Sequence, residues 1–159
     1  MRTPLLESFL AEGRDLVEDA SECLLLLERT PEDPEVVNRA FRSVHTLKGN
    51  SGLFEFAPLT ELLHAAEELM VLARDGGVSL TGEIIDVLLE TSDAVRVFLD
   101  EIDGHLEIST RAAEEGRRLT AALAALVPKD EAPGPVGADA EAELPGWAEE
   151  IPVELAGPG

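Results

Sequence analysis

The chain has 159 residues and a formal net charge of −21, with 33 Asp and Glu against 12 Lys and Arg. This acidity excludes general electrostatic binding to nucleic acid or to anionic membranes, because both need a basic face. With 45% hydrophobic residues the chain can bury one core. It has no run of about 18 apolar residues that would span a membrane. The single cysteine, Cys23, fits a reducing compartment, so we expect a cytoplasmic protein.

The composition changes after residue 128. Residues 129–159 contain eight acidic residues, one lysine and five of the ten prolines, without a sustained apolar period. They are predicted to be an acidic Pro/Ala/Gly-rich linker or tail, disordered or loosely held. Such a segment suits either a plain terminus or a connection to a further domain. Residues 1–128 are expected to form one helical domain.

Five predicted helices follow one another in this domain. The first runs from a cap at Thr3 to about residue 29, and the second begins at Asp33 and loosens over residues 49–52. The remaining three cover residues 58–75, a stretch from a Thr81 cap to at least residue 102, and residues 108–127. Short connections favour antiparallel neighbours. The fold class is therefore predicted to be all-α, an up-down four-helix bundle with an additional fifth C-terminal helix.

The end of the second predicted helix departs from a plain bundle helix. Residues 49–52 are four weak helix formers in a row, and glycine inside a helix costs about 0.5–1 kcal/mol relative to alanine. His45 lies just beyond the core arc, and Gly49 and Gly52 follow it on nearly the same line. A histidine is thus displayed beside bare backbone, where a partner protein can approach closely. The core arc itself consists of Val36, Ala40, Phe41, Val44 and Leu47.

Two charged residues are placed to act on His45. Lys48, one of only two lysines, lies one turn away and would suit a phosphate as a point charge, or else snorkels from the core edge. Glu67, three residues after His64 in the third helix, would reach the His45 ring if the two helices pack antiparallel. Its carboxylate would then accept from Nδ1–H and leave Nε2 as the free lone pair. The alternative is a solvated helix face, which we expect for Glu68.

These residues resemble the histidine phosphotransfer (HPt) family, most closely the N-terminal phosphotransfer domain of CheA-type chemotaxis histidine kinases. The resemblance rests on His-Thr-Leu-Lys-Gly-Asn-Ser-Gly at 45–52, Phe-Glu-Phe at 54–56 and His-x-x-Glu at 64–67. It implies that His45 is phosphorylated on Nε2 and that Glu67 orients Nδ1. It also implies that Lys48 assists at the phosphate and that His64 belongs to the surrounding hydrogen-bond network.

The resemblance further implies two protein partners and no cofactor in the chain itself. The phosphoryl group would come from ATP, with Mg²⁺, through a separate histidine kinase domain. It would pass to an aspartate of a response-regulator receiver domain. The chain lacks a Gly-x-x-x-x-Gly-Lys-Ser/Thr phosphate loop, so it is not expected to be catalytic alone. The domain itself is expected to be monomeric.

Two alternatives stay open at this point. One is a free-standing relay protein that acts between two receiver domains. The other is a metal-binding bundle, because Glu61 and His64 form a Glu-x-x-His motif of the kind that di-iron bundles use. No second copy of that motif is present, so no metal site is expected. His105 is expected to be an ordinary surface residue.

Overall fold

The computed structural model describes residues 3–128, and every regular element in that range is an α-helix. The prediction of an all-α fold is therefore confirmed. No helix among the described residues is both long enough and apolar enough to cross a membrane. The helices are α1 (Pro4–Arg29), α2 (Pro34–Ser51), α3 (Ala57–Arg74), α4 (Gly82–His105) and α5 (Thr110–Leu126).

The helix starts are set by local side-chain caps. Thr3, Asp33, Thr81 and Ser109 each accept a hydrogen bond from a backbone N–H in the first turn of the helix that follows. These N–H groups have no partner inside the helix, and such a cap contributes about 1 kcal/mol. The caps expected at Thr3 and Thr81 are confirmed, and Asp33 caps the helix that was predicted to begin there.

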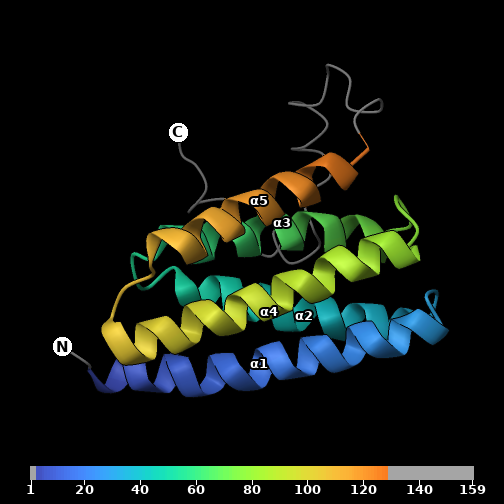
Figure 1. Ribbon diagram of the computed structural model, residues 1–159. Coiled ribbons are helices and arrows are strands. Elements are labelled where there is room, and N and C mark those ends of the chain that lie inside the picture. The colour runs from blue at the N-terminus through green and yellow to red at the C-terminus, as the bar shows by residue number, and fades with distance from the viewer. Residues whose placement is uncertain (1–2, 129–159) are drawn as a thin grey trace, which may run out of the picture. The chain divides into compact units, whose positions relative to one another are not determined.

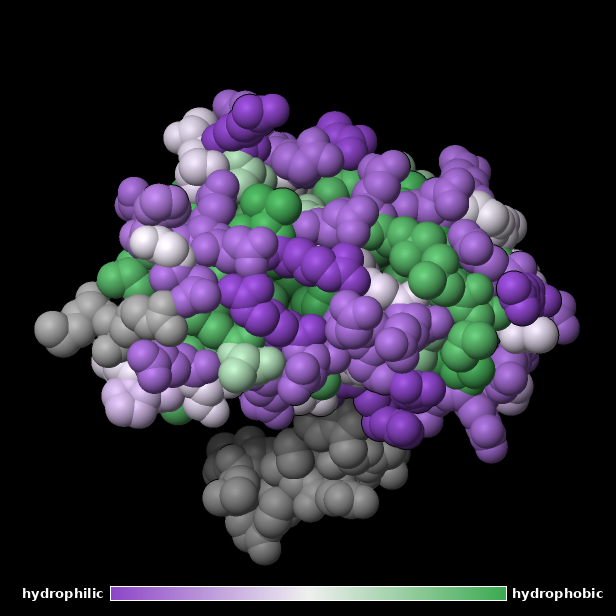
Figure 2. Space-filling view, turned by 60° about the horizontal axis from the view of Figure 1, so that its bottom comes forward, coloured by the Kyte–Doolittle hydropathy of each residue, from purple (hydrophilic) through white to green (hydrophobic). Residues whose placement is uncertain are grey.

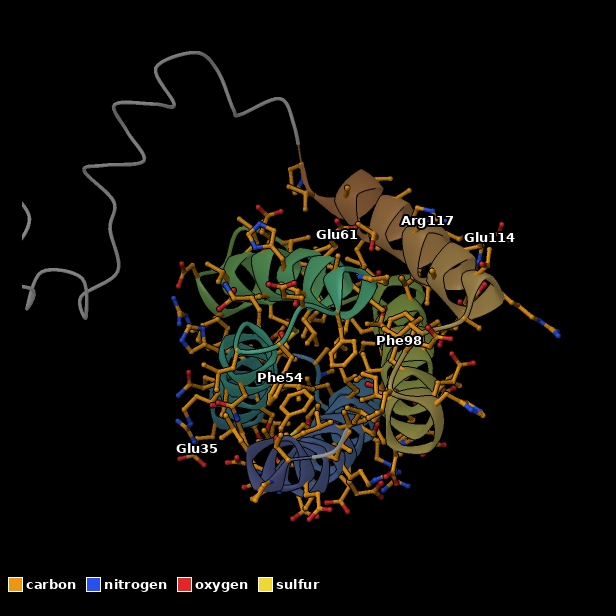
Figure 3. All side chains as sticks on the ribbon, turned by 90° about the vertical axis from the view of Figure 1, so that its left-hand side faces the viewer. Glu35, Phe54, Glu61, Phe98, Glu114 and Arg117 are labelled. Carbon is orange, nitrogen blue, oxygen red and sulfur yellow. The ribbon has the colours of Figure 1, made fainter. Side chains whose placement is uncertain are left out.

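Helices α1 to α4 run up and down beside one another, and α5 lies across α3 and α4 (Figure 1). Seen along the helices, the rings of Phe54 and Phe98 point into the interior, whereas labelled charged side chains point outward (Figure 3). The predicted four-helix bundle with a fifth C-terminal helix is therefore confirmed. Its most completely buried large side chains are Leu27, Leu59, Leu62, Leu69, Met70, Ile85, Val95, Phe98, Leu99, Ile102, Leu119 and Leu123.

Hydrophilic residues predominate on the face of the bundle shown in Figure 2, with smaller hydrophobic patches between them. Several ion pairs join neighbouring helices, as where Arg14 of α1 contacts Asp100 and Asp103 of α4 at 2.5 and 3.1 Å. These pairs are exposed, so each contributes at most about 1 kcal/mol. The bundle is therefore held mainly by its apolar interior, and the acidic surface is a solvated background to the site described below.

The second helix does not loosen at residue 49 as predicted, but continues to Ser51. The Ser51 hydroxyl is fully buried, lies 2.8 Å from the Lys48 carbonyl oxygen and meets the Thr60 hydroxyl of α3 at 3.1 Å. A contact with the neighbouring helix thus outweighs the weak helix propensity of this segment. The predicted acidic tail or linker at 129–159 lies outside the described residues.

Gly116 sets the distance between α5 and α4. A Cβ at residue 116 would lie 2.8 Å from the Phe98 ring, which is itself fully buried, so the ring or the helix would have to shift. We expect Gly116→Ala to lower the free energy of unfolding by about 1–3 kcal/mol through overpacking. Urea denaturation measures the effect. Gly104→Ala is the matched control, because a Cβ there meets nothing within 4 Å, and it should leave stability unchanged or raise it by up to about 1 kcal/mol. Equal stabilities for the two variants would contradict the packing argument.

Candidate functional site

His45 is displayed on α2 with about half of its side chain exposed, at 49%. The opposite face of the same helix is anchored in the core by Ala40 and Leu47. The Nδ1 atom of His45 contacts the Oε2 atom of Glu67, which comes from the antiparallel helix α3. The contact expected from the two helical wheels is therefore present. Because Nδ1 faces a carboxylate, Nε2 is the ring nitrogen left for chemistry.

Glu67 is a buried carboxylate that contacts two side chains of α2 at once. Its Oε1 atom lies 2.5 Å from Lys48 Nζ while its Oε2 atom faces His45. Burial by itself would raise the pKa of Glu67, but the hydrogen bonds and charges of Lys48 and His45 outweigh it, so the pKa is held below its ordinary value. The side chain therefore stays ionised and accepts from both neighbours. This makes it an acceptor for Nδ1–H, as its predicted orienting role requires.

His64 does not join this group in the way that was expected. Its Nε2 atom lies 3.3 Å from Glu68 Oε2 on the same helix, and both side chains are more than half exposed. The physical reason is that both oxygens of Glu67 already face α2, so the acceptor available to His64 is Glu68, one turn further along α3. The expected place of His64 in the hydrogen bonds around His45 is therefore corrected to an exposed pair with Glu68.

The backbone beyond His45 is open. A Cβ at Gly49 would meet nothing within 4 Å, and Leu53, just after the helix, is 65% exposed. Gly52 ends α2, and its backbone N–H bonds the carbonyl oxygens of the preceding turn. Open backbone and an exposed leucine suit the predicted role of Gly49 and Gly52 in partner access. That role itself stays a prediction.

Two residues that the sequence did not single out also lie at the site. The Phe41 ring stacks on the His45 imidazole with a centroid separation of 5.6 Å and an interplanar angle of 18°. The Arg74 guanidinium, at the end of α3, sits 4.4 Å from the centroid of the Phe41 ring. Phe41 was assigned to the core arc, although its position one turn before His45 was a usable signal. Arg74 gave no such signal, because it comes from another helix.

No cluster of three or more His, Cys, Asp or Glu side chains suited to a metal ion is found within residues 3–128. His105, the last residue of α4, is exposed. Cys23 is fully buried, and burial raises the pKa of its thiol. Among the three histidines, His45 is the one whose ring contacts a buried carboxylate.

Comparison with known proteins agrees with this geometry. A family model described as the Hpt domain matches residues 4–98. The chain is 38% identical to the chemotaxis protein CheA of Halobacterium salinarum over 97 residues, which are 61% of this chain and 14% of that protein. The chain spans only 12–19% of the length of the curated relatives that it matches.

Two solved structures have the same fold. The solution structure of the histidine phosphotransfer domain of CheA superposes with a TM-score of 0.72 at 26% identity, covering 80% of this chain and 95% of that one. The crystal structure of the phosphorylated P1 domain of CheA3 in complex with CheY6 from R. sphaeroides gives a TM-score of 0.67 at 28% identity. It covers 77% of this chain and 97% of that one.

The lowered pKa of Glu67 predicts how this residue contributes to stability as a function of pH. Its folded-state pKa lies below its unfolded value, so its contribution is complete above the unfolded pKa and is lost as pH falls through the folded pKa. We expect Glu67→Gln to be less stable than wild type at pH 7 and to lose less stability between pH 6 and pH 3. Urea midpoints across that range test this.

Glu61→Gln, an exposed change on the same helix, is the control and should keep the wild-type slope. Asp19, whose pKa is also lowered by Arg39 and Ser43 against the effect of burial, is present in all three proteins and cancels in the comparison. Parallel curves for wild type and Glu67→Gln would contradict the ionised, doubly paired Glu67.

Proposed function

The chain belongs to the Hpt domain family, and from this premise we propose that it accepts a phosphoryl group on His45 and passes it on in a two-component phosphorelay. One observation carries the proposal: a half-exposed histidine whose Nδ1 is engaged by a buried carboxylate while Nε2 is left unengaged. A base or nucleophile oriented by a third group is the general arrangement for activated nucleophiles.

The first step is attack of the Nε2 lone pair on the γ-phosphorus of ATP. An N–P bond forms, the bond from phosphorus to the bridging oxygen breaks, and ADP leaves with that electron pair. The ring keeps its Nδ1 proton, so it becomes positively charged. The Glu67 carboxylate, already in contact with Nδ1, offsets this charge and so stabilises the product.

Lys48 is placed to respond to the new charge. A phosphoryl group adds about two negative charges to an acidic domain. Lys48 lies one turn from His45, with its Nζ atom at Glu67 and 28% of its side chain exposed. The flexible lysine stem lets the ammonium move from the carboxylate toward the phosphate, where it acts as a point charge.

The second step moves the phosphoryl group to an aspartate of a receiver domain. The N–P bond breaks and an O–P bond to the aspartate forms, which returns His45 to its neutral state. The R. sphaeroides neighbour was crystallised as a phosphorylated P1 domain with CheY6, and this supports a response-regulator receiver as the recipient. The bare backbone at Gly49 leaves room for such a partner beside His45.

The phosphoryl donor is a separate domain. We propose that ATP and Mg²⁺ bind to the kinase domain of a CheA-like histidine kinase, with chemotaxis as the output. The match to a small fraction of much longer CheA relatives supports a domain that works with other parts of such a kinase. We also propose a cytoplasmic location, which ATP as the donor and the free Cys23 support.

Phosphorylation should require His45 and a kinase domain. We expect the isolated chain to take up label from ATP only when a CheA kinase core is added, and the label to be acid-labile and alkali-stable. His45→Gln should abolish labelling, whereas His64→Gln and His105→Gln, at exposed histidines outside the Glu67 group, should still be labelled. Labelling of His45→Gln at the wild-type level would refute the assignment.

The variant Glu67→Gln should distinguish a role of Glu67 in orienting the His45 ring from a role in folding. The amide keeps the shape of the side chain but is a weaker acceptor for Nδ1–H and carries no charge to balance the phosphorylated ring. We expect a native helical circular dichroism spectrum and a phosphorylation rate lower by about tenfold or more. Glu68→Gln, at the exposed neighbour, is the control and should label at the wild-type rate. A wild-type rate in Glu67→Gln would remove the orienting role.

A further inference from the structure

The His45 ring is constrained in two different directions. The Glu67 carboxylate contacts Nδ1 and so fixes which edge of the ring faces α3. The Phe41 ring lies nearly parallel to the imidazole, with 18° between the planes and 5.6 Å between the centroids. One contact acts at the edge of the imidazole and the other acts on its face.

Both constraints are needed because the ring is not packed in the core. About half of the His45 side chain is exposed, and the χ2 angle of histidine has broad minima. A hydrogen bond at one ring nitrogen leaves the ring free to tilt about that bond. A ring stacked on its face opposes this tilt, and offset stacking is worth about 0.5–1.5 kcal/mol.

Phe41 is itself held in place by a cation–π contact with an arginine of another helix. It is only partly buried, and the Arg74 guanidinium lies 4.4 Å from its centroid. Arg74 lines a hollow with Pro34 and Asn38 at the start of α2, whereas His45 lies one turn beyond Phe41 toward the other end. The guanidinium and the imidazole therefore reach Phe41 from opposite directions along α2.

We propose that Phe41, seated by Arg74, is a positioning residue that sets the plane of the His45 imidazole and hence the direction of the Nε2 lone pair. The inference rests on the proposed function of His45 and adds a residue to it. Phe41 touches neither the phosphoryl donor nor the acceptor. It acts through His45, so its loss should change the reactivity of the ring rather than the docking of partners.

The test uses a phosphoryl donor that needs no docking surface. The full chain is phosphorylated with phosphoramidate, a small molecule whose P–N bond breaks as the Nε2–P bond forms, releasing ammonia. We expect Phe41→Leu to lower the maximal rate about two- to tenfold, the range of a lost aromatic contact, with the half-saturating phosphoramidate concentration unchanged. Phe41→Tyr, which keeps the ring, should restore the rate. Arg74→Gln should act in the same direction by a smaller factor, and Arg74→Lys should retain more of the rate.

A second readout follows the ring without any phosphorylation. Nitrogen-15 NMR of His45 reports the ratio of the Nδ1–H and Nε2–H tautomers. We expect Phe41→Leu to reduce the excess of the Nδ1–H form, because a tilted ring makes a poorer bond to Glu67. Val36→Ala, a truncation at another partly buried position of α2, is the control for lost packing and should change neither the tautomer ratio nor the rate.

The outcomes separate the two proposals. A wild-type rate and tautomer ratio in Phe41→Leu, or an equal effect of Val36→Ala, would overturn the positioning role. A wild-type chain that neither phosphoramidate nor a kinase core phosphorylates at His45 would overturn the proposed function, while the tautomer ratio would still decide whether Phe41 holds the ring.

Discussion

The site depends on a carboxylate placed where a helical bundle would ordinarily hold an apolar side chain. Glu67 is buried between α2 and α3, and its two oxygens face His45 and Lys48. A buried charge without a partner costs several kcal/mol, so the contacts of Glu67 with Lys48 and His45 stabilise the fold as well as shape the site. The same contacts that join α2 to α3 also decide which nitrogen of His45 is free. In this domain the packing of two helices and the orientation of the His45 ring are one arrangement.

The remainder of the bundle keeps that arrangement rigid. Helix α1 packs against α2, and α5 lies against α3 and α4, so both helices that carry the site are held from outside. The buried contact between Ser51 and Thr60 joins the end of α2 to the start of α3. Under the proposed function the site presents one lone pair to two successive partners, and it would benefit from elements that move little. The exposed ion pairs of the acidic exterior add little to this stability. Lys48 differs from that exterior because it is a cation paired with a buried carboxylate.

Much of this could be predicted because the signals are local. The caps at Thr3 and Thr81 depend on residues within one turn, and the His45–Glu67 contact follows from two helical wheels and a short loop. The structure differs from these predictions where side chains of more than one helix can form the same contact. Ser51 stays helical because its hydroxyl contacts that of Thr60, and helix propensities do not take such a contact between helices into account. His64 contacts Glu68 because both oxygens of Glu67 already contact side chains of α2. The position of Arg74 over Phe41 depends on how far α3 extends along α2, which no pattern within either helix reveals.

The open space at Gly49 separates what the fold needs from what a partner needs. A methyl group there would touch nothing in the domain, and alanine is the better helix former by about 0.5–1 kcal/mol. Within the isolated chain this glycine therefore lowers the stability of α2, and no contact inside the domain requires it. Under the proposed function its value would lie in a complex, where the absence of a side chain would let the receiver aspartate come closer to His45. If His45 transfers phosphate as proposed, Gly49 is a position where the requirements of partner approach and of helix stability are opposed.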